Sequence, residues 1–266
     1  MNFFQTIHPQ PVAFSLLGRD FYWYGLIISF SILIGFLIVL QIAKKKQIAV
    51  MHIYNLLFLF IVCGLIGGRI AYILTEWQVF SGNWSDAFKV WDGGISLYGV
   101  IIANLAALAV YSKIKKISGW VISDLIVLVM PLMQAIGRWG NYFNQELFGK
   151  PTSLPWSIFI ETARRPFAYL EDQYFHPLFL YESLLMLGVF IVFLVLWRSG
   201  KLKTGDLTLL YFFLYSLVRF FLDFLRIEPP MLGWLSIAQW ISVLFIAAAG
   251  LLWYFRGRLA GVKSQD

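Results

Sequence analysis

Residues 21–43 read FYWYGLIISFSILIGFLIVLQIA, and the next three residues are lysines, Lys44 to Lys46. The stretch holds no charged side chain, and at a rise of about 1.5 Å per residue it is long enough to cross a hydrocarbon core of about 30 Å. The quoted residues therefore predict a membrane-spanning helix. Basic residues collect on the cytoplasmic side of such helices, so the lysines predict that this helix ends in the cytoplasm.

The rest of the chain repeats this pattern. Of its 266 residues, 60% are hydrophobic and 13% are charged, which is more apolar surface than a soluble domain of this size can bury in one core. We expect an all-α polytopic membrane protein, a single membrane-embedded domain over residues 1–266. About seven transmembrane helices are predicted, near residues 21–43, 51–75, 95–112, 119–137, 177–197, 206–226 and 234–255.

The basic residues predict the orientation of these helices. The formal net charge of +7 does not indicate nucleic-acid binding, because the cations lie in short clusters between apolar runs. The clusters follow the first, third, fifth and last spans: Lys44, Lys45 and Lys46; Lys113, Lys115 and Lys116; Arg198, Lys201 and Lys203; Arg256, Arg258 and Lys263. All four then lie in the cytoplasm, with the N-terminus outside and the C-terminus inside. The start, MNFFQTIHPQ, lacks the features of a removable signal peptide.

The connection between the fourth and fifth predicted spans is unusually long. It covers about residues 138–176, and loops of this length are commonly functional or form a small subdomain, here facing outward. Cys63 is the single cysteine and lies in an apolar run, which excludes an internal disulfide. The three histidines lack zinc-ligand spacing, so no metal site is expected.

Polar residues gather near the predicted outer ends of the helices. Arg226 lies 20 residues beyond Asp206, Arg69 lies 18 residues beyond Met51, and Arg138 lies 18 residues beyond Trp120. At about 1.5 Å per residue, all three reach a similar depth just under the outer surface. Tyr24, Tyr98, Tyr181, Glu182, Arg219 and Asp223 fall in the same layer.

Two interpretations of these arginines remain open. A single arginine near a helix end usually extends to the lipid headgroups, and Arg219 with Asp223 at i+4 is compatible with a purely structural pair. Several arginines from different helices, however, favour an anion site. The planar guanidinium donates two parallel hydrogen bonds to phosphate, and a lipid headgroup is the phosphate present at this depth.

Residues 137–146, GRWGNYFNQE, are the most specific motif of the chain. They resemble the G-R-x-G-N-[FY]-x-N-x-E signature of prolipoprotein diacylglyceryl transferases at every fixed position. Supporting matches cover nearly the whole chain: Trp23-Tyr24-Gly25, Gly68-Arg69, Gly93-Gly94-Ile95-Ser96, His176-Pro177 with Tyr181-Glu182, and Arg219 through Arg226 before a proline.

The resemblance implies a bacterial inner-membrane enzyme that works without a cofactor at the outer leaflet. Such an enzyme transfers diacylglyceryl from phosphatidylglycerol to the lipobox cysteine thiol of a preprolipoprotein and releases glycerol 1-phosphate. Its expected partners are these two substrates and the bilayer, with no nucleic acid, and the protein is expected to be a monomer. Catalytic roles are implied for Arg138, Arg226, Tyr98 and Glu146. Phosphatidylglycerol binding is implied for Arg138, Asn141, Asn144, Arg226, Arg69, Tyr24, Arg219 and Glu182.

One turn departs from the family pattern. Many members have S-x-H-G-G where this chain has Ser96-Leu97-Tyr98-Gly99-Val100, so a histidine base is absent there. Two other functions stay open: a transporter or flippase for an anionic lipid or solute, and an inactive lipoprotein-binding scaffold. Transporters usually place their site near the midplane at a repeat interface, whereas here the charge lies at one end and no repeat is visible.

Overall fold

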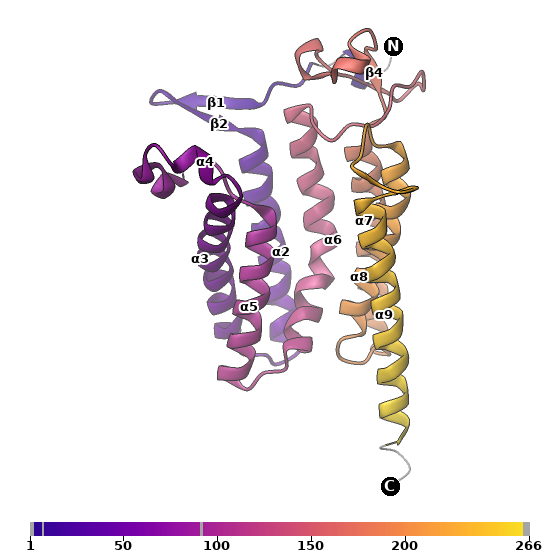
Figure 1. Cartoon of the computed structure of the whole chain (residues 1–266). Coiled ribbons are helices and arrows are strands. Elements are labelled where there is room, and N and C mark those ends of the chain that lie inside the picture. Colours follow the sequence, from indigo (N-terminus) through magenta and orange to yellow (C-terminus); the bar gives the residue numbers. More distant parts are fainter. Residues whose placement is uncertain (1–2, 7, 91–92, 263–266) are drawn as a thin grey trace. The chain divides into compact units, whose positions relative to one another are not determined.

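The computed structural model describes residues 3–6, 8–90 and 93–262. Among these residues, seven helices are long and apolar enough to cross a membrane, which confirms the all-helical class and the number of spans. They are α2 (Trp23–Lys45), α3 (Val50–Thr75), α5 (Leu97–Lys115), α6 (Gly119–Asn144), α7 (Leu178–Ser199), α8 (Asp206–Leu222) and α9 (Ile237–Val262) (Figure 1).

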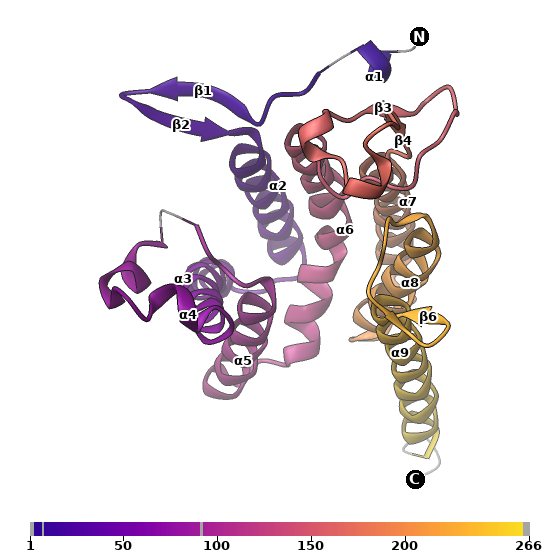
Figure 2. The ribbon, with the colours of Figure 1, turned by 45° about the horizontal axis from the view of Figure 1, so that its top comes forward.

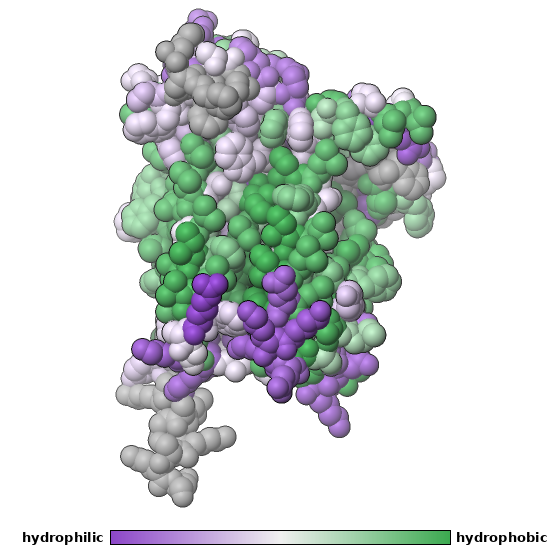
Figure 3. All heavy atoms as spheres, turned by 180° about the vertical axis from the view of Figure 1, so that it is seen from behind, coloured by the Kyte–Doolittle hydropathy of each residue, from purple (hydrophilic) through white to green (hydrophobic). Residues whose placement is uncertain are grey.

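The spanning helices expose apolar side chains that a soluble protein would bury. Only 11% to 39% of each helix's most apolar window is buried inside the protein. On the face drawn in Figure 3, hydrophobic side chains cover most of the helical surface, and hydrophilic ones gather toward helix ends. A bilayer covers such surfaces, as the composition predicts.

The chain divides into two compact units, which we describe separately. The first contains residues 1–37 and 126–266, and the second contains residues 38–125. Helices α2 and α6 each run from one unit into the other.

In the second unit, α3 packs along α5 (Figure 2). Glycines allow the close approach, since a Cβ on Gly64 would lie 3.3 Å from Asn104 and Val100, and a Cβ on Gly67 would lie 2.9 Å from the Gly99 carbonyl. Small residues take this role between membrane helices. The short helices α4 (Trp77–Phe80) and η1 (Trp84–Phe88) follow α3.

In the first unit, α8 packs against α7 and α9 (Figure 1). The C-terminal part of α6 lies against α2, where two glycines of the quoted motif make the contact. A Cβ on Gly140 would lie 2.7 Å from the Tyr24 ring, and one on Gly137 would lie 3.1 Å from Ile28. The glycines of the motif therefore serve helix packing.

Three short antiparallel hairpins interrupt the helical fold. They are β1 (Val12–Leu16) with β2 (Arg19–Tyr22), β3 (Ile158–Phe159) with β4 (Tyr174–Phe175), and β5 (Met231–Leu232) with β6 (Leu235–Ser236). Leu17 and Gly18 join the first pair with φ angles of 51° and 74°, as a two-residue hairpin turn requires. The four strands β3 to β6 have two residues each, too short to produce an alternating sequence pattern, and the all-α prediction also omits the longer hairpin of β1 and β2.

The connection between α6 and α7 is ordered around an apolar cluster. Ile158, Ile160 and Phe175 of the connection pack with Tyr142 of α6 and Phe179 of α7. Two short helices, η3 (Thr162–Arg164) and η4 (Phe167–Tyr169), complete it. The connection is thus folded onto the ends of the two helices that it joins.

The predicted start of this connection, residue 138, is wrong. Helix α6 continues to Asn144, so most of the quoted motif is helical. The helix ends in a Schellman motif, in which Gln145 N–H donates to Tyr142 and Glu146 N–H donates to Asn141. Gln145 takes the left-handed position (φ 51°) that glycine usually occupies. Its side chain donates to the Pro9 carbonyl and accepts from Glu161 N–H, which stabilises that conformation.

Candidate active site

Glu182 lies between two arginines that come from neighbouring helices. Its carboxylate, on α7, accepts a hydrogen bond of 2.5 Å from Arg138 on α6 and one of 3.4 Å from Arg219 on α8. Only 4% of the Glu182 side chain is exposed. A buried carboxylate needs such cationic partners, so Glu182 fixes the two guanidinium groups relative to each other.

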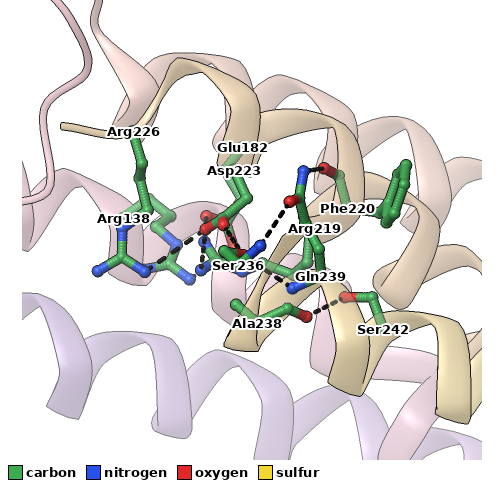
Figure 4. Close-up of polar contacts among 10 residues, drawn as sticks. All are labelled: Arg138, Glu182, Arg219, Phe220, Asp223, Arg226, Ser236, Ala238, Gln239 and Ser242. Atoms are coloured by element: carbon green, nitrogen blue, oxygen red, sulfur yellow. Dashed lines mark hydrogen bonds and ion pairs between the residues drawn. The ribbon is translucent and has the colours of Figure 1, made fainter. Parts of the chain in front are cut away.

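Asp223 connects a third arginine to this pair (Figure 4). It lies in η5 (Asp223–Leu225), directly after α8, with its side chain fully buried. Its Oδ1 lies 3.5 Å from Arg226 Nη1 and 3.9 Å from Arg219 Nη2. Arg219 and Asp223 are therefore not an isolated pair. Asp223 contacts both Arg219 and Arg226, and it lies closer to Arg226. We call Arg138, Arg219 and Arg226 with Glu182 and Asp223 the arginine cluster.

The arginine cluster carries a surplus of positive charge beside a small cavity. Three guanidinium groups pair with two carboxylates, which gives these five side chains a formal net charge of +1. The cavity beside them, about 20 Å³, has room for about one water molecule. It is lined by Arg138, Leu147, Leu178, Phe179, Glu182, Arg219, Leu222 and Arg226. Charged and apolar side chains thus meet at one site.

Arg226 is the member best placed to bind an anion. Within the described chain its guanidinium makes no hydrogen bond, only the ion pair with Asp223. Its side chain is 32% exposed, more than those of Arg138 (20%) and Arg219 (23%). The guanidinium N–H groups that do not face Asp223 are therefore available to a phosphate.

The two asparagines of the motif converge on Glu146. Asn141 Nδ2 donates to Glu146 Oε1 at 2.7 Å, and Asn144 Nδ2 donates to the same oxygen at 3.4 Å. Asn141 also accepts from Arg138 at 3.4 Å, which joins this group to the arginine cluster. The Schellman motif at the end of α6 brings Glu146 back over Asn141, so the spacing of the motif follows from the helix end.

Arg69 has a different environment from the one expected. Its five N–H groups donate to five backbone carbonyls, those of Asp86, Ala87, Lys89, Gly93 and Gly94, at 2.5 to 3.3 Å. The expectation that Arg69 binds lipid phosphate therefore has no geometric support, because a guanidinium has only five donors.

Gly93 and Gly94, two of the residues that carry the family resemblance, both have a left-handed backbone conformation. Gly93 and Gly94 have φ angles of 89° and 76°, and a Cβ on Gly94 would lie 2.7 Å from Arg69 Nη1. Glycine is required there because side chains rarely adopt this backbone conformation. Trp91 and Asp92, which precede the turn, lie outside the described residues.

Tyr98 and Tyr24 occupy the starts of their helices. Tyr98 lies in the first turn of α5, in the second unit, with 75% of its surface exposed. Its hydroxyl makes no hydrogen bond within the described residues. Tyr24, in the first unit, packs its ring against Gly140 of the motif.

Two groups near the arginine cluster are not evident from the sequence. Gly149 pairs with Arg226 in an isolated β-bridge, and a Cβ there would lie 2.8 Å from the Leu225 carbonyl and 2.9 Å from His176 Cβ. Tyr215 of α8 interacts with the Arg138 guanidinium. A single glycine in a loop and a tyrosine in an apolar helix carry no recognisable local signal.

A second polar group lies where the connection meets α7. The Tyr181 hydroxyl accepts from Trp156 Nε1 at 2.8 Å and lies 3.1 Å from His176 Nδ1. Burial lowers the pKa of the His176 imidazole, so this ring is neutral at neutral pH. Within the described ranges, no group of three or more His, Cys, Asp or Glu side chains could hold a metal ion.

Comparison with known proteins gives consistent matches over most of the chain. The family model described as prolipoprotein diacylglyceryl transferase matches residues 11–255. Relatives named phosphatidylglycerol–prolipoprotein diacylglyceryl transferase include those of Synechococcus elongatus, 37% identical with 94% of this chain and 89% of the relative covered, and Synechocystis, 36% identical with 95% and 92% covered. The protein of that name from Acaryochloris marina is 38% identical, with 93% and 91% covered.

Proposed function

Because the chain belongs to the prolipoprotein diacylglyceryl transferase family, we propose that it transfers diacylglyceryl from phosphatidylglycerol to the lipobox cysteine of a preprolipoprotein. The arginine cluster is the observation that carries this proposal, since it offers a surplus positive charge beside a partly apolar cavity. A transporter is not favoured, because the relatives are named as transferases.

In the proposed reaction, the thiol sulfur bonds to a carbon of phosphatidylglycerol. This is the carbon of the diacylated glycerol that carries the phosphate. The carbon–oxygen bond breaks, and its electron pair leaves with glycerol 1-phosphate. The thiol proton balances the added charge on the departing phosphate. The phosphate oxygen gains negative charge along this path, so arginine donors aimed at it stabilise the transition state more than the bound lipid.

We propose a separate role for each residue of the site. Arg226 and Arg138 bind the phosphate, with Arg219 and Glu182 holding them in place, and Asn141, Asn144 and Glu146 bind the glycerol hydroxyls. Tyr24 lies on the side of the site that faces the bound lipid. For Arg69 we propose a positioning role, because its donors hold the loop before Tyr98.

The direct test uses purified protein, phosphatidylglycerol and a lipobox peptide. The expected products are glycerol phosphate and a peptide with diacylglycerol in thioether linkage. If neither product forms with folded protein, the transferase proposal is wrong.

We expect Tyr98→Phe to be slowed but active. We expect the exposed hydroxyl to donate a hydrogen bond to the substrate and not to act as a base, and loss of one such hydrogen bond costs roughly 0.5–3 kcal/mol. Tyr98→His, which restores the residue of many relatives, should keep activity that falls at acid pH as the imidazole is protonated. Turnover assays from pH 5 to 9 measure both variants. Complete inactivity of folded Tyr98→Phe would make the phenol part of proton transfer.

We also propose a bacterial inner-membrane location, with the N-terminus and the α6–α7 connection outside and the C-terminus inside. The four basic clusters support this orientation. In a Cys63→Ser background, an impermeant thiol reagent applied to intact cells should label Glu161→Cys and not Lys115→Cys. The reverse pattern would invert the topology and place the site away from exported preprolipoproteins.

A further inference from the structure

Asp223 also contacts Ser236, through the carboxylate oxygen that does not face the arginines. Its Oδ2 accepts a hydrogen bond from the Ser236 hydroxyl, while Oδ1 faces Arg226 and Arg219 without a hydrogen bond (Figure 4). The two oxygens of this fully buried carboxylate are therefore used differently. One is held by a neutral donor, and the other attracts two cations across 3.5 and 3.9 Å.

Ser236 is itself fixed by the start of α9. Gln239 N–H donates to Ser236 Oγ at 3.0 Å, and Ser236 N–H donates to Gln239 Oε1 at 2.9 Å, which is a reciprocal capping box. Gln239 Nε2 also donates to the Phe220 carbonyl of α8 at 3.3 Å. The Ser236 oxygen accepts from the helix, so the one hydroxyl proton is left for Asp223.

We infer that Ser236 is a positioning residue that keeps Arg226 available for the substrate phosphate. This inference rests on the proposed function. While Ser236 occupies Oδ2, Asp223 presents only one oxygen to Arg226, and the guanidinium donors stay free. Without that hydroxyl, Oδ2 is a buried acceptor with no neutral donor, and Asp223 turns both oxygens toward the arginines. A bidentate Asp223–Arg226 pair then uses the donors that phosphate needs.

The inference also predicts which kinetic constants change. Neither Ser236 nor Gln239 lines the cavity of the arginine cluster, so Ser236 acts only through Asp223. Its loss should weaken binding of the phosphate, in the substrate and in the product. It should leave binding of the lipobox peptide unchanged.

The experiment compares Ser236 variants that lose the hydroxyl donor with one that keeps it. Loss of the hydrogen bond to Asp223 can then be distinguished from loss of the helix cap. Ser236→Gly retains most of the capping preference but has no donor, and Ser236→Cys keeps the size with a weak donor. Ser236→Thr keeps both functions. The matched control is Ser242→Ala, since Ser242 is also buried on α9 but donates only to the Ala238 carbonyl, at 2.8 Å.

For Ser236→Gly and Ser236→Cys we expect the KM for phosphatidylglycerol to rise about tenfold, as loss of a hydrogen bond to a charged group predicts. Inhibition by glycerol 1-phosphate should weaken by a similar factor. Ser236→Thr and Ser242→Ala should stay within about twofold of the parent. The KM for the lipobox peptide should be the same in all five proteins.

Results that differ from these contradict either the inference about Ser236 or the proposed function. A parental KM for phosphatidylglycerol in Ser236→Cys or Ser236→Gly overturns the inference. So does an activity loss that only follows the folded fraction, measured by thermal unfolding, because a structural cap would do the same. If Ser236→Gly does not fold, the isosteric Ser236→Cys decides alone. If the parent and Ser242→Ala both make no thioether product, the proposed function fails instead.

Discussion

Replacing Arg226 with lysine is expected to lower kcat/KM by about 100-fold or more, with the protein still inserted in the membrane. Loss of one preorganised donor at a developing anion typically costs about 2.7–4 kcal/mol of transition-state stabilisation. Lysine keeps the charge but loses the planar fork, which can donate two parallel hydrogen bonds to one phosphate. Initial rates with phosphatidylglycerol and a lipobox peptide measure the effect.

Arg164→Lys is the matched control for this change. Arg164 lies on η3 of the α6–α7 connection and is exposed, so the substitution should leave activity within about twofold, as surface changes usually do. Parental activity in Arg226→Lys would mean that a diffuse positive field is sufficient. Bidentate phosphate recognition at this residue would then be wrong.

Gly149→Ala is expected to cause a loss of similar size. The new Cβ would lie 2.8 Å from the Leu225 carbonyl, and backbone atoms cannot yield as a flexible side chain can. The segment around Gly149, which forms an isolated β-bridge with Arg226, must then shift. A displacement of about 1 Å at a catalytic group can cost about 100-fold in rate, and overpacking destabilises by roughly 1–3 kcal/mol. Steady-state rates and thermal unfolding test both effects.

Gly188→Ala provides the comparison. Gly188 lies inside α7, and a Cβ there would meet no atom within 4 Å. Alanine favours a helix interior over glycine by about 0.5–1 kcal/mol, so this variant should be active and slightly more stable. An active Gly149→Ala protein would show that the Gly149–Arg226 pairing is not needed to position the guanidinium.

The spans were predictable because each is encoded locally. A run such as residues 21–43 has to cross the bilayer whatever surrounds it, and the observed α2 (Trp23–Lys45) starts and ends within two residues of that run. The depth count also brought Arg138 and Arg226 to one layer, and the structure joins both to the arginine cluster. Helical rise is regular enough for such a count to hold.

The partners of these residues were less predictable, because they depend on tertiary packing. The residue count predicts the same depth for Arg69 and Arg138, yet the loop carbonyls around Arg69 use all its donors. The end of α6 was misplaced because Gln145 occupies a position where the sequence rules expect glycine. Likewise, Ser236 and Gln239 match a capping box, but only the fold brings that box to Asp223.

The charge balance of the arginine cluster bears on the choice among membrane lipids. With three cations and two anions, the cluster becomes neutral when one singly charged phosphodiester binds. A headgroup that also carries an ammonium brings its own positive charge close to the guanidinium groups, and like charges in a site of low dielectric repel strongly. We therefore expect the arginine cluster to prefer an anionic phospholipid over the zwitterionic ones that are the most abundant lipids of many bilayers, with the nearby Glu146 carboxylate limiting the strength of this electrostatic preference.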